Sequence, residues 1–211
     1  MIAIVDYGMG NLRSIHNALD YVGGKPRITA RPQDLEDAAA VVLPGVGAFS
    51  DAMRALRDSG MVEVMEREVL DKGKPFLGIC LGMQLLARES DEGGLHAGLG
   101  WIDARVERIR PDDPTCKVPH MGWNNVTVLD DGVLFKGLKD ENVTFYFVHS
   151  YQVVPDAGHE DMLTMVSWHG CRIHAALRKD NIMATQFHPE KSQMAGIKVL
   201  SNFVDHVTAE G

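Results

Sequence analysis

The sequence predicts an α/β protein with a central, mostly parallel mixed sheet, helices on both of its faces, and an antiparallel extension in the second half. In the first half, short apolar segments alternate with segments whose apolar residues recur at helical spacing, as in parallel sheets covered on both faces. In the second half, short strands follow one another with only turn residues between them, which is typical of antiparallel pairing. No repeat or linker divides the chain, so we expect residues 1–211 to form one domain.

The first half contains four expected strands and four expected helices. The first helix shows the pattern well, because Leu12, Ile15, Leu19 and Val22 share one face and two glycines follow. The expected strands are residues 2–6, 26–29, 39–43 and 76–79, and the expected helices are residues 11–22, 48–56, 61–70 and 81–88. This alternation predicts that the four strands run parallel.

The second half is dominated by short β segments and ends in a helix. The expected strands are residues 106–109, 126–128, 144–148, 163–166, 173–177 and 182–187, and the helix covers residues 192–207. We expect these strands to extend the same sheet rather than to form a second one.

Composition excludes several classes of protein. The net charge of −8 argues against nucleic acid as a partner, and no run of about 20 apolar residues predicts a membrane span. Residues 1–6 lack the basic region and long apolar stretch of a secretory signal, so we do not expect one. Three irregularly spaced cysteines predict no disulfide framework, and the chain shows no zinc-type ligand spacing. We therefore expect a cytoplasmic protein with no metal and no cofactor.

Cys80 is the strongest candidate for a catalytic residue. It follows an apolar strand, precedes a helix, and is flanked by Gly78 and Gly82. This is the Gly-x-nucleophile-x-Gly turn with cysteine in place of serine, and its small neighbours permit a sharp turn that exposes the nucleophile at the sheet edge. The start of the next helix favours the thiolate. Cys116 and Cys171 have no such setting, and we expect them to be inert.

His188 and Glu190 supply a base and an orienting carboxylate. They follow the strand predicted at residues 182–187, so they leave the sheet at the carboxyl edge that Cys80 also leaves. The carboxylate can hold the imidazole in one tautomer while the imidazole accepts the thiol proton. Pro189 stiffens the turn between the two residues. Cys80, His188 and Glu190 therefore predict a nucleophilic triad.

The loop after the third strand is a candidate oxyanion hole. Residues 44–49 read Pro-Gly-Val-Gly-Ala-Phe, and the glycines let the peptide between Val46 and Gly47 rotate. The second donor is the backbone N–H of Leu81, directly after the nucleophile. On its own, the Pro-Gly-x-Gly pattern indicates no more than a turn.

These residues together resemble the triad-type, class I glutamine amidotransferases. The resemblance rests on Gly78–Gln84 and Gln186–Glu190 and spans nearly the whole chain. Four further segments narrow the resemblance to the glutaminase subunits of imidazole glycerol phosphate synthases, which act in histidine biosynthesis. These segments are residues 6–12, 44–49, 117–124 and 146–151.

The resemblance implies that Cys80 attacks the side-chain amide of L-glutamine and forms a γ-glutamyl thioester, which water hydrolyses to glutamate. It also implies that the ammonia passes to a separate (β/α)8-barrel cyclase subunit in an obligate heterodimer. The implied substrate contacts are Gly45, Gln84, His149, Ser150 and Tyr151. The candidate interface residues are Met9, Asn11, His120, Met121, Trp123 and Asn124, although Trp123 could instead be a core residue.

Three other functions stay open at this point. The chain could feed a different synthase, such as one that makes anthranilate, aminodeoxychorismate or pyridoxal phosphate. It could be a cysteine peptidase or γ-glutamyl hydrolase on a similar sheet, or a binding subunit without activity, which the intact triad argues against. The segment Trp168–His174 is rich in histidine and cysteine, and we assign it no function.

Overall fold

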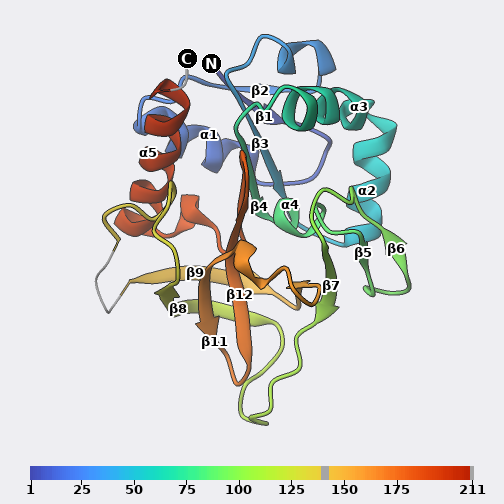
Figure 1. Cartoon of the computed structure of the whole chain (residues 1–211), viewed down its shortest axis with the longest axis vertical. Helices are drawn as coiled ribbons and strands as arrows, with labels where there is room; N and C mark the ends of the chain where they lie inside the picture. Colours follow the sequence, from blue (N-terminus) through green and yellow to red (C-terminus); the bar gives the residue numbers. More distant parts are fainter. Residues whose placement is uncertain (139–142, 210–211) are drawn as a thin grey trace.

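The computed structural model describes residues 1–138 and 143–209, and its centre is a nine-stranded mixed sheet (Figure 1). The strands lie in the order β2 (Pro26–Thr29), β1 (Ile2–Val5), β3 (Ala40–Gly45), β4 (Phe76–Cys80), β13 (Ile182–Thr185), β12 (Arg172–Lys179), β11 (Leu163–Trp168), β8 (His120–Val128) and β9 (Thr144–His149). The first five strands pair in parallel, and all later pairs are antiparallel. The predicted fold class is therefore confirmed.

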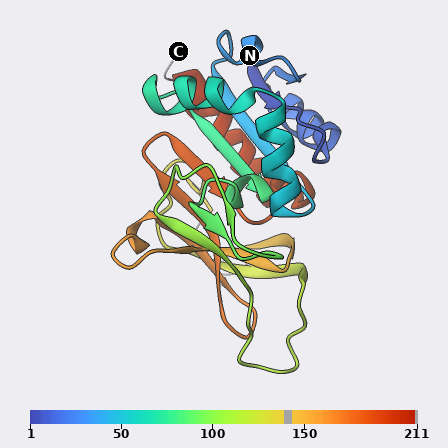
Figure 2. The same ribbon diagram turned by 90° about the vertical axis from the view of Figure 1, so that its right-hand side faces the viewer.

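The inner parallel strands β1, β3 and β4 are buried along their whole length because helices cover both faces. In β1, Ile2 and Ile4 face the core shared with α1 (Leu12–Tyr21) and α5 (Gln193–Ala209). The alternate residues, Ala3 and Val5, face α2 (Phe49–Asp58) and α3 (Met61–Met65), which a π-helical turn at Glu66–Asp71 continues. Figures 1 and 2 show the two helix layers on opposite sides of these strands. The period of two within each strand produces this division.

The helix expected at residues 81–88 is much shorter than predicted. α4 spans only Leu81–Gln84. Beyond it, the carbonyls of Leu85, Leu86 and Ala87 accept hydrogen bonds from the backbone of residues 99–102, at 2.9 to 3.2 Å. This loop takes the acceptors that another helical turn would use, so the chain leaves the helix and enters β5 (Glu89–Ser90).

A second sheet was not anticipated. The strand expected at residues 106–109 is β7 (Ala104–Arg108), and it lies in a four-stranded sheet with β10 (Tyr151–Pro155), β5 and β6 (His96–Ala97), not in the main sheet. Figure 2 shows this sheet beneath α2 and α3. Its buried side, including Val106 and Val153, joins the core beneath these helices. Packing against that core places β7 apart from the main sheet, and the prediction of a single sheet was wrong in this respect.

β8 is three times longer than the sequence predicted. It begins at His120 instead of residue 126, and its polar first half pairs with β9 from His120 to Asn125. Half-buried and exposed side chains alternate in this stretch, so it contains no apolar run that would have indicated a strand.

Among the described residues, no helix has the length and apolar character needed to cross a membrane.

The turn from β4 into α4 leads to a prediction about Gly82. A Cβ added there would lie 1.8 Å from the carbonyl oxygen of Leu43 in β3, which is a backbone atom that cannot move aside. We expect Gly82→Ala to lower the free energy of unfolding by about 3 kcal/mol or more. Urea denaturation measures this loss.

The matched control is Gly73→Ala. Gly73 has φ +71° with nothing within 4 Å of an added Cβ, so this substitution carries only the conformational cost of about 1 to 2 kcal/mol. Equal losses for the two variants would contradict the steric explanation.

Candidate active site

Cys80 ends β4 in a strained backbone conformation. Its φ is +56° and its ψ is −108°, a region that residues with a side chain rarely adopt. The turn is possible only because its flanks are glycines: a Cβ on Gly78 would lie 2.8 Å from the carbonyl oxygen of Gly82. The strain, and the close approach of α4 to the sheet, agree with the predicted nucleophile turn.

His188 reaches the same sheet edge from the neighbouring strand. β13 runs parallel to β4 with Thr185 opposite Ile79, so the chain beyond β13 passes beside Cys80. His188 Nδ1 lies 2.8 Å from Glu190 Oε1, and the side chains are only 3% and 1% exposed. Nε2 of His188 is buried, and no described protein atom forms a hydrogen bond with it. The pair therefore has the geometry of an oriented base.

The electrostatics of His188 favour the imidazolium. Burial lowers the pKa of His188, but its interactions with Cys80 and then with Glu190 outweigh burial and raise the pKa to about 9. At neutral pH the ring therefore carries the proton that a leaving group would need. The pKa of the nearby Tyr7 phenol is also raised, first by burial and then by the charge of Cys80.

A cavity of about 340 Å³ opens over Cys80. Most of the candidate residues line it. The lining residues are Val46, Gly47, Cys80, Gln84, Glu92, Pro119, Val148, His149, Ser150, Tyr151 and His188. Three segments far apart in the sequence therefore meet at the carboxyl ends of β3, β4 and β13, as the parallel topology predicts.

The β3 loop forms the wall of the cavity nearest to Cys80. Gly45 pairs with Cys80 across the sheet, and it is a glycine by necessity, because a Cβ there would lie 2.5 Å from the Tyr7 hydroxyl and 2.9 Å from the Leu81 side chain. The Tyr7 hydroxyl donates to the carbonyl oxygen of Pro44 at 2.9 Å and holds the start of the loop. Gly45, which was expected to contact the substrate, does not line the cavity.

The second half of this loop is more open. Val46 is 41% exposed, and Gly47 has φ +106°, with the methyl group of Met9 3.0 Å from the position of its missing Cβ. Leu81 is the first residue of α4, directly after Cys80. The predicted oxyanion residues therefore flank Cys80 on two sides.

The opposite wall is polar. Gln84 is buried, and its amide nitrogen donates to the carbonyl oxygen of Tyr151 at 2.9 Å and to Gln186 Oε1 at 3.0 Å. His149 Nδ1 lies 2.8 Å from the same Tyr151 oxygen. The contacts fix the backbone of residues 149–151, which lines the cavity.

Sequence reasoning did not single out three residues of this site. Gln186 is fully buried and its amide nitrogen lies 3.7 Å from Cys80 Sγ. Glu92 lines the cavity and accepts a hydrogen bond at 2.7 Å from the N–H of Phe49, which begins α2. Tyr7 holds the β3 loop. Gln186 was detectable as a polar residue at the end of an apolar strand, whereas Glu92 comes from the unanticipated sheet.

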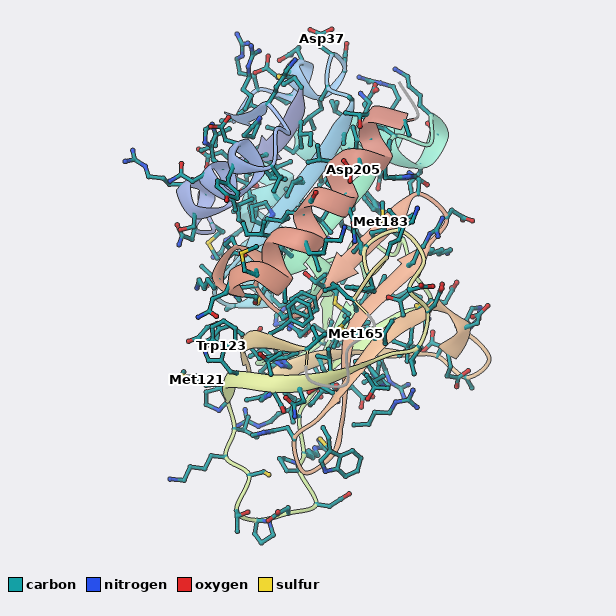
Figure 3. The ribbon with its side chains drawn as sticks, turned by 90° about the vertical axis from the view of Figure 1, so that its left-hand side faces the viewer. Asp37, Met121, Trp123, Met165, Met183 and Asp205 are labelled. Atoms are coloured by element: carbon teal, nitrogen blue, oxygen red, sulfur yellow. The ribbon has the colours of Figure 1, made fainter. Side chains whose placement is uncertain are left out.

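The candidate interface residues differ in exposure. Met121 and Trp123 are 62% and 47% exposed, and Figure 3 shows them side by side at one edge of the sheet extension. Trp123 is therefore not a core residue. Asn11 is exposed and caps α1, accepting from the N–H of Ser14 at 3.4 Å. Met9 and Asn124 are half-buried.

His120 differs from its neighbours. It is only 3% exposed, stacked between the rings of Phe147 and His169 at centroid distances of 4.6 and 4.3 Å. The proposal that its side chain faces a partner was therefore wrong, because its position at the start of β8 turns it inward. The segment Trp168–His174, which had no assigned function, comprises the end of β11, the hairpin turn that carries His169, and the start of β12.

The arrangement can carry out acyl transfer. A cysteine at the sheet edge, an imidazole oriented by a carboxylate, and two flanking backbone segments are the parts that nucleophilic attack on an amide requires. A profile of the family "Glutamine amidotransferase class-I" matches residues 3–207. The chain therefore belongs to the class-I glutamine amidotransferases.

Comparison with individual relatives assigns the chain to a narrower family within this class. It is 51% identical over 210 residues to the imidazole glycerol phosphate synthase subunit HisH of Methanothermobacter thermautotrophicus, covering 99% of this chain and 100% of that protein. It is 49% identical over 211 residues to HisH of Zymomonas mobilis, covering 97% and 95%. Within the class, the chain belongs to the family of HisH subunits of imidazole glycerol phosphate synthase.

Solved structures share the fold at low identity. A glutamine amidotransferase superimposes with a TM-score of 0.72 at 20% identity, covering 99% of this chain and all of that one. A chain of the PurLQS complex from Thermotoga maritima superimposes with a TM-score of 0.73 at 18% identity, covering 97% of each chain. These likenesses concern the fold alone.

The raised pKa of His188 is testable in solution. We expect NMR titration of the His188 ring to give a pKa near 9, compared with 6.5 for an ordinary histidine. Glu190→Gln should lower this pKa by about one unit or more, because it removes a charged hydrogen-bond partner. Glu160→Gln, which changes an exposed carboxylate, serves as the control.

The same pKa fixes how stability depends on pH. Because folding raises the pKa of His188, protonation stabilises the folded state, and this contribution is complete below pH 6.5 and disappears as the pH rises through about 9. A His188 pKa near 6.5 in the folded protein would contradict the stabilisation of the imidazolium by Cys80 and Glu190.

Proposed function

We propose that this chain hydrolyses L-glutamine to L-glutamate and ammonia and delivers the ammonia to a cyclase partner subunit. The observation that carries the proposal is the meeting of Cys80 with the oriented His188–Glu190 pair in one cavity. The relatives named imidazole glycerol phosphate synthase subunit HisH favour this acceptor enzyme over the other synthases left open by the sequence.

In the first half of the reaction, the Cys80 thiolate attacks the side-chain carbonyl carbon of glutamine and forms a C–S bond. The carbonyl π electrons move to oxygen, and the oxyanion accepts from the N–H of Leu81 and from the peptide between Val46 and Gly47. Collapse of this intermediate breaks the C–N bond. The protonated His188 gives its proton to the departing nitrogen, which leaves as ammonia.

In the second half, neutral His188 takes a proton from water as the water oxygen attacks the thioester carbon. The second tetrahedral intermediate expels the Cys80 thiolate and leaves glutamate. Glu190 holds Nδ1 of His188 throughout, which keeps Nε2 directed at the reacting atoms. Gln84, Ser150 and Tyr151 line the cavity where the substrate's other polar groups would lie.

The β3 loop suggests a regulated enzyme. Val46 is exposed and Gly47 has the freedom of glycine, so the peptide between them is free to rotate into and out of the oxyanion position. The loss of one donor from an oxyanion hole lowers the rate of catalysis about a hundred- to a thousand-fold. We propose that the free subunit is nearly inactive and that the partner and its ligand turn this peptide.

The proposed partner is a (β/α)8-barrel cyclase subunit, which would use the ammonia to make imidazole glycerol phosphate and aminoimidazole carboxamide ribotide. The exposed Met121 and Trp123 beside the cavity's Pro119 support an interface there, since methionine and aromatic residues are enriched at interfaces.

We also propose a cytoplasmic location, because all three cysteines are free thiols. One domain over residues 1–211 remains part of this proposal.

The first test measures glutamate release from glutamine by this chain alone and with a barrel cyclase subunit plus its ribotide ligand. We expect about a hundred- to a thousand-fold more activity in the mixture, because the second oxyanion donor is then in place. Cys80→Ala should abolish the activity in both cases, while Cys116→Ala should leave it unchanged. Equal activity with and without the partner would refute the latent oxyanion hole, and turnover by Cys80→Ala would refute the mechanism.

A second test concerns the interface. Trp123→Ala should weaken binding to the cyclase subunit by more than about 2 kcal/mol in calorimetry if this side chain is a central anchor. Tyr21→Ala is the matched control, since Tyr21 is an exposed aromatic residue at the far end of α1 (76% exposed). Equal affinities for the two variants would place the interface elsewhere.

A further inference from the structure

Gln186 is a buried polar residue that the mechanism above does not use. It directly follows β13, is 0% exposed, and places its amide nitrogen 3.7 Å from Cys80 Sγ. A buried side-chain amide costs free energy unless its donors and acceptor are satisfied. Its second contact is with Gln84, at 3.0 Å. Gln186 therefore touches the reacting atom on one side and a fixed hydrogen-bond network on the other.

The Tyr151 carbonyl decides which end of Gln186 faces the sulfur. A carbonyl oxygen only accepts, so Gln84 must present its NH2 group to it, at 2.9 Å. The same NH2 group lies 3.0 Å from Gln186, whose facing atom must then be the amide oxygen. The other end of Gln186, directed at Cys80, is therefore the NH2 group.

His149 reinforces this direction. Its Nδ1 lies 2.8 Å from the Tyr151 oxygen, and burial lowers the pKa of His149 to about 3, so the ring is neutral and has one N–H. That N–H must be on Nδ1, because the carbonyl can only accept. Both lone pairs of the Tyr151 oxygen are then used, by His149 and Gln84. A reversed Gln84 amide would place its oxygen against the Tyr151 carbonyl oxygen, which would then lose one of its two hydrogen bonds.

We propose that Gln186 is a further catalytic residue, which donates an N–H···S hydrogen bond to Cys80 and stabilises its thiolate, while Gln84 acts as the positioning residue that fixes the donor's direction. The inference rests on the proposed role of Cys80 as the nucleophile. Hydrogen bonds to charged acceptors are stronger than those to neutral ones, so the contact favours the thiolate over the thiol.

The chemistry gives this donor a role that His188 cannot fill alone. His188 gives up its proton when ammonia leaves and regains one when water attacks, so its charge changes during the reaction. The amide proton of Gln186 is not transferred, so the N–H stays directed at the sulfur through both halves of the reaction. When water attacks the thioester, the C–S bond breaks and its electron pair returns to sulfur, where Gln186 stabilises the departing thiolate.

The test measures alkylation of Cys80 by iodoacetamide as a function of pH, without glutamine. A Cys116→Ser and Cys171→Ser background leaves Cys80 as the only thiol. Gln186→Met keeps the length of the side chain and removes the donor, so the midpoint of the pH–rate profile should rise by about one unit. The alkylation rate below that midpoint should fall about tenfold.

Gln186→Glu is the second variant, since it keeps the shape and still offers an oxygen to Gln84. It places a carboxylate oxygen against the sulfur, and the midpoint should rise further than in Gln186→Met. If Gln186→Met does not fold, the Glu variant alone decides. An unchanged midpoint in a folded Gln186 variant would overturn the proposal.

Gln152→Met is the matched control. Gln152 is also a buried glutamine, but its amide bonds the backbone of β12, accepting from the N–H of His174 at 3.0 Å and donating to the carbonyl oxygen of Arg172 at 3.3 Å. It should lower the thermal midpoint and leave the alkylation profile unchanged. A midpoint shift as large as that of Gln186→Met would show a general packing effect and overturn the proposal.

The readout separates this inference from the proposed function. An unchanged alkylation profile together with glutaminase activity that depends on Cys80 would reject the role of Gln186 and leave the function in place. A shifted profile in a protein that never hydrolyses glutamine would support the hydrogen bond and reject the function.

Discussion

The structure depends on one close backbone approach, between α4 and the carboxyl end of β3. A side chain on Gly82 would overlap the carbonyl oxygen of Leu43, so the first turn of α4 lies directly on the neighbouring strand. This approach forces the chain to reverse within one residue, and Cys80 takes the strained φ of +56°. The strain persists because the surrounding residues, Leu81 to Ala87, are almost completely buried. The position of the nucleophile at the sheet edge, where it lines the cavity, is thus the consequence of a packing constraint.

Parallel topology then determines which residues can act on Cys80. Gly45 of β3 lies opposite Cys80 in the register, and Thr185 of β13 lies opposite Ile79. The loops that leave these two strands must pass on either side of the sulfur. One brings the peptide between Val46 and Gly47, and the other brings Gln186 and His188. The two loops differ in burial, because β13 continues into the buried turn at Pro189 whereas the β3 loop is exposed at Val46 and Gly47.

The sequence predicted those features that depend on local pattern. Apolar runs and helical spacing identified the parallel half, and the glycines beside Cys80 identified the turn. It could not predict where α4 ends, because the carbonyls of Leu85 and Leu86 are taken by a loop more than ten residues downstream. The four-stranded sheet was missed for a similar reason, since β5 and β6 have two residues each and exist only through pairing. His120 was misplaced because alternation along β8 gives no indication of which face is buried.

The buried side of β8 connects the cavity with the face that carries Trp123. His149 Nε2 is an acceptor once Nδ1 holds the proton, so His120 Nδ1 must donate to it at 3.0 Å. Burial, together with the nearby His169, lowers the pKa of His120 to about 4, so its Nε2 is in turn an acceptor for the Asn124 amide at 3.0 Å. These hydrogen bonds all point the same way, from Asn124 through His120 and His149 to the Tyr151 carbonyl oxygen. That oxygen in turn orients Gln84 and Gln186. A displacement of β8 at the exposed edge would therefore disturb hydrogen bonds that end at the Cys80 sulfur. The same strand thus connects the exposed edge that carries Trp123 to the hydrogen bonds around Cys80.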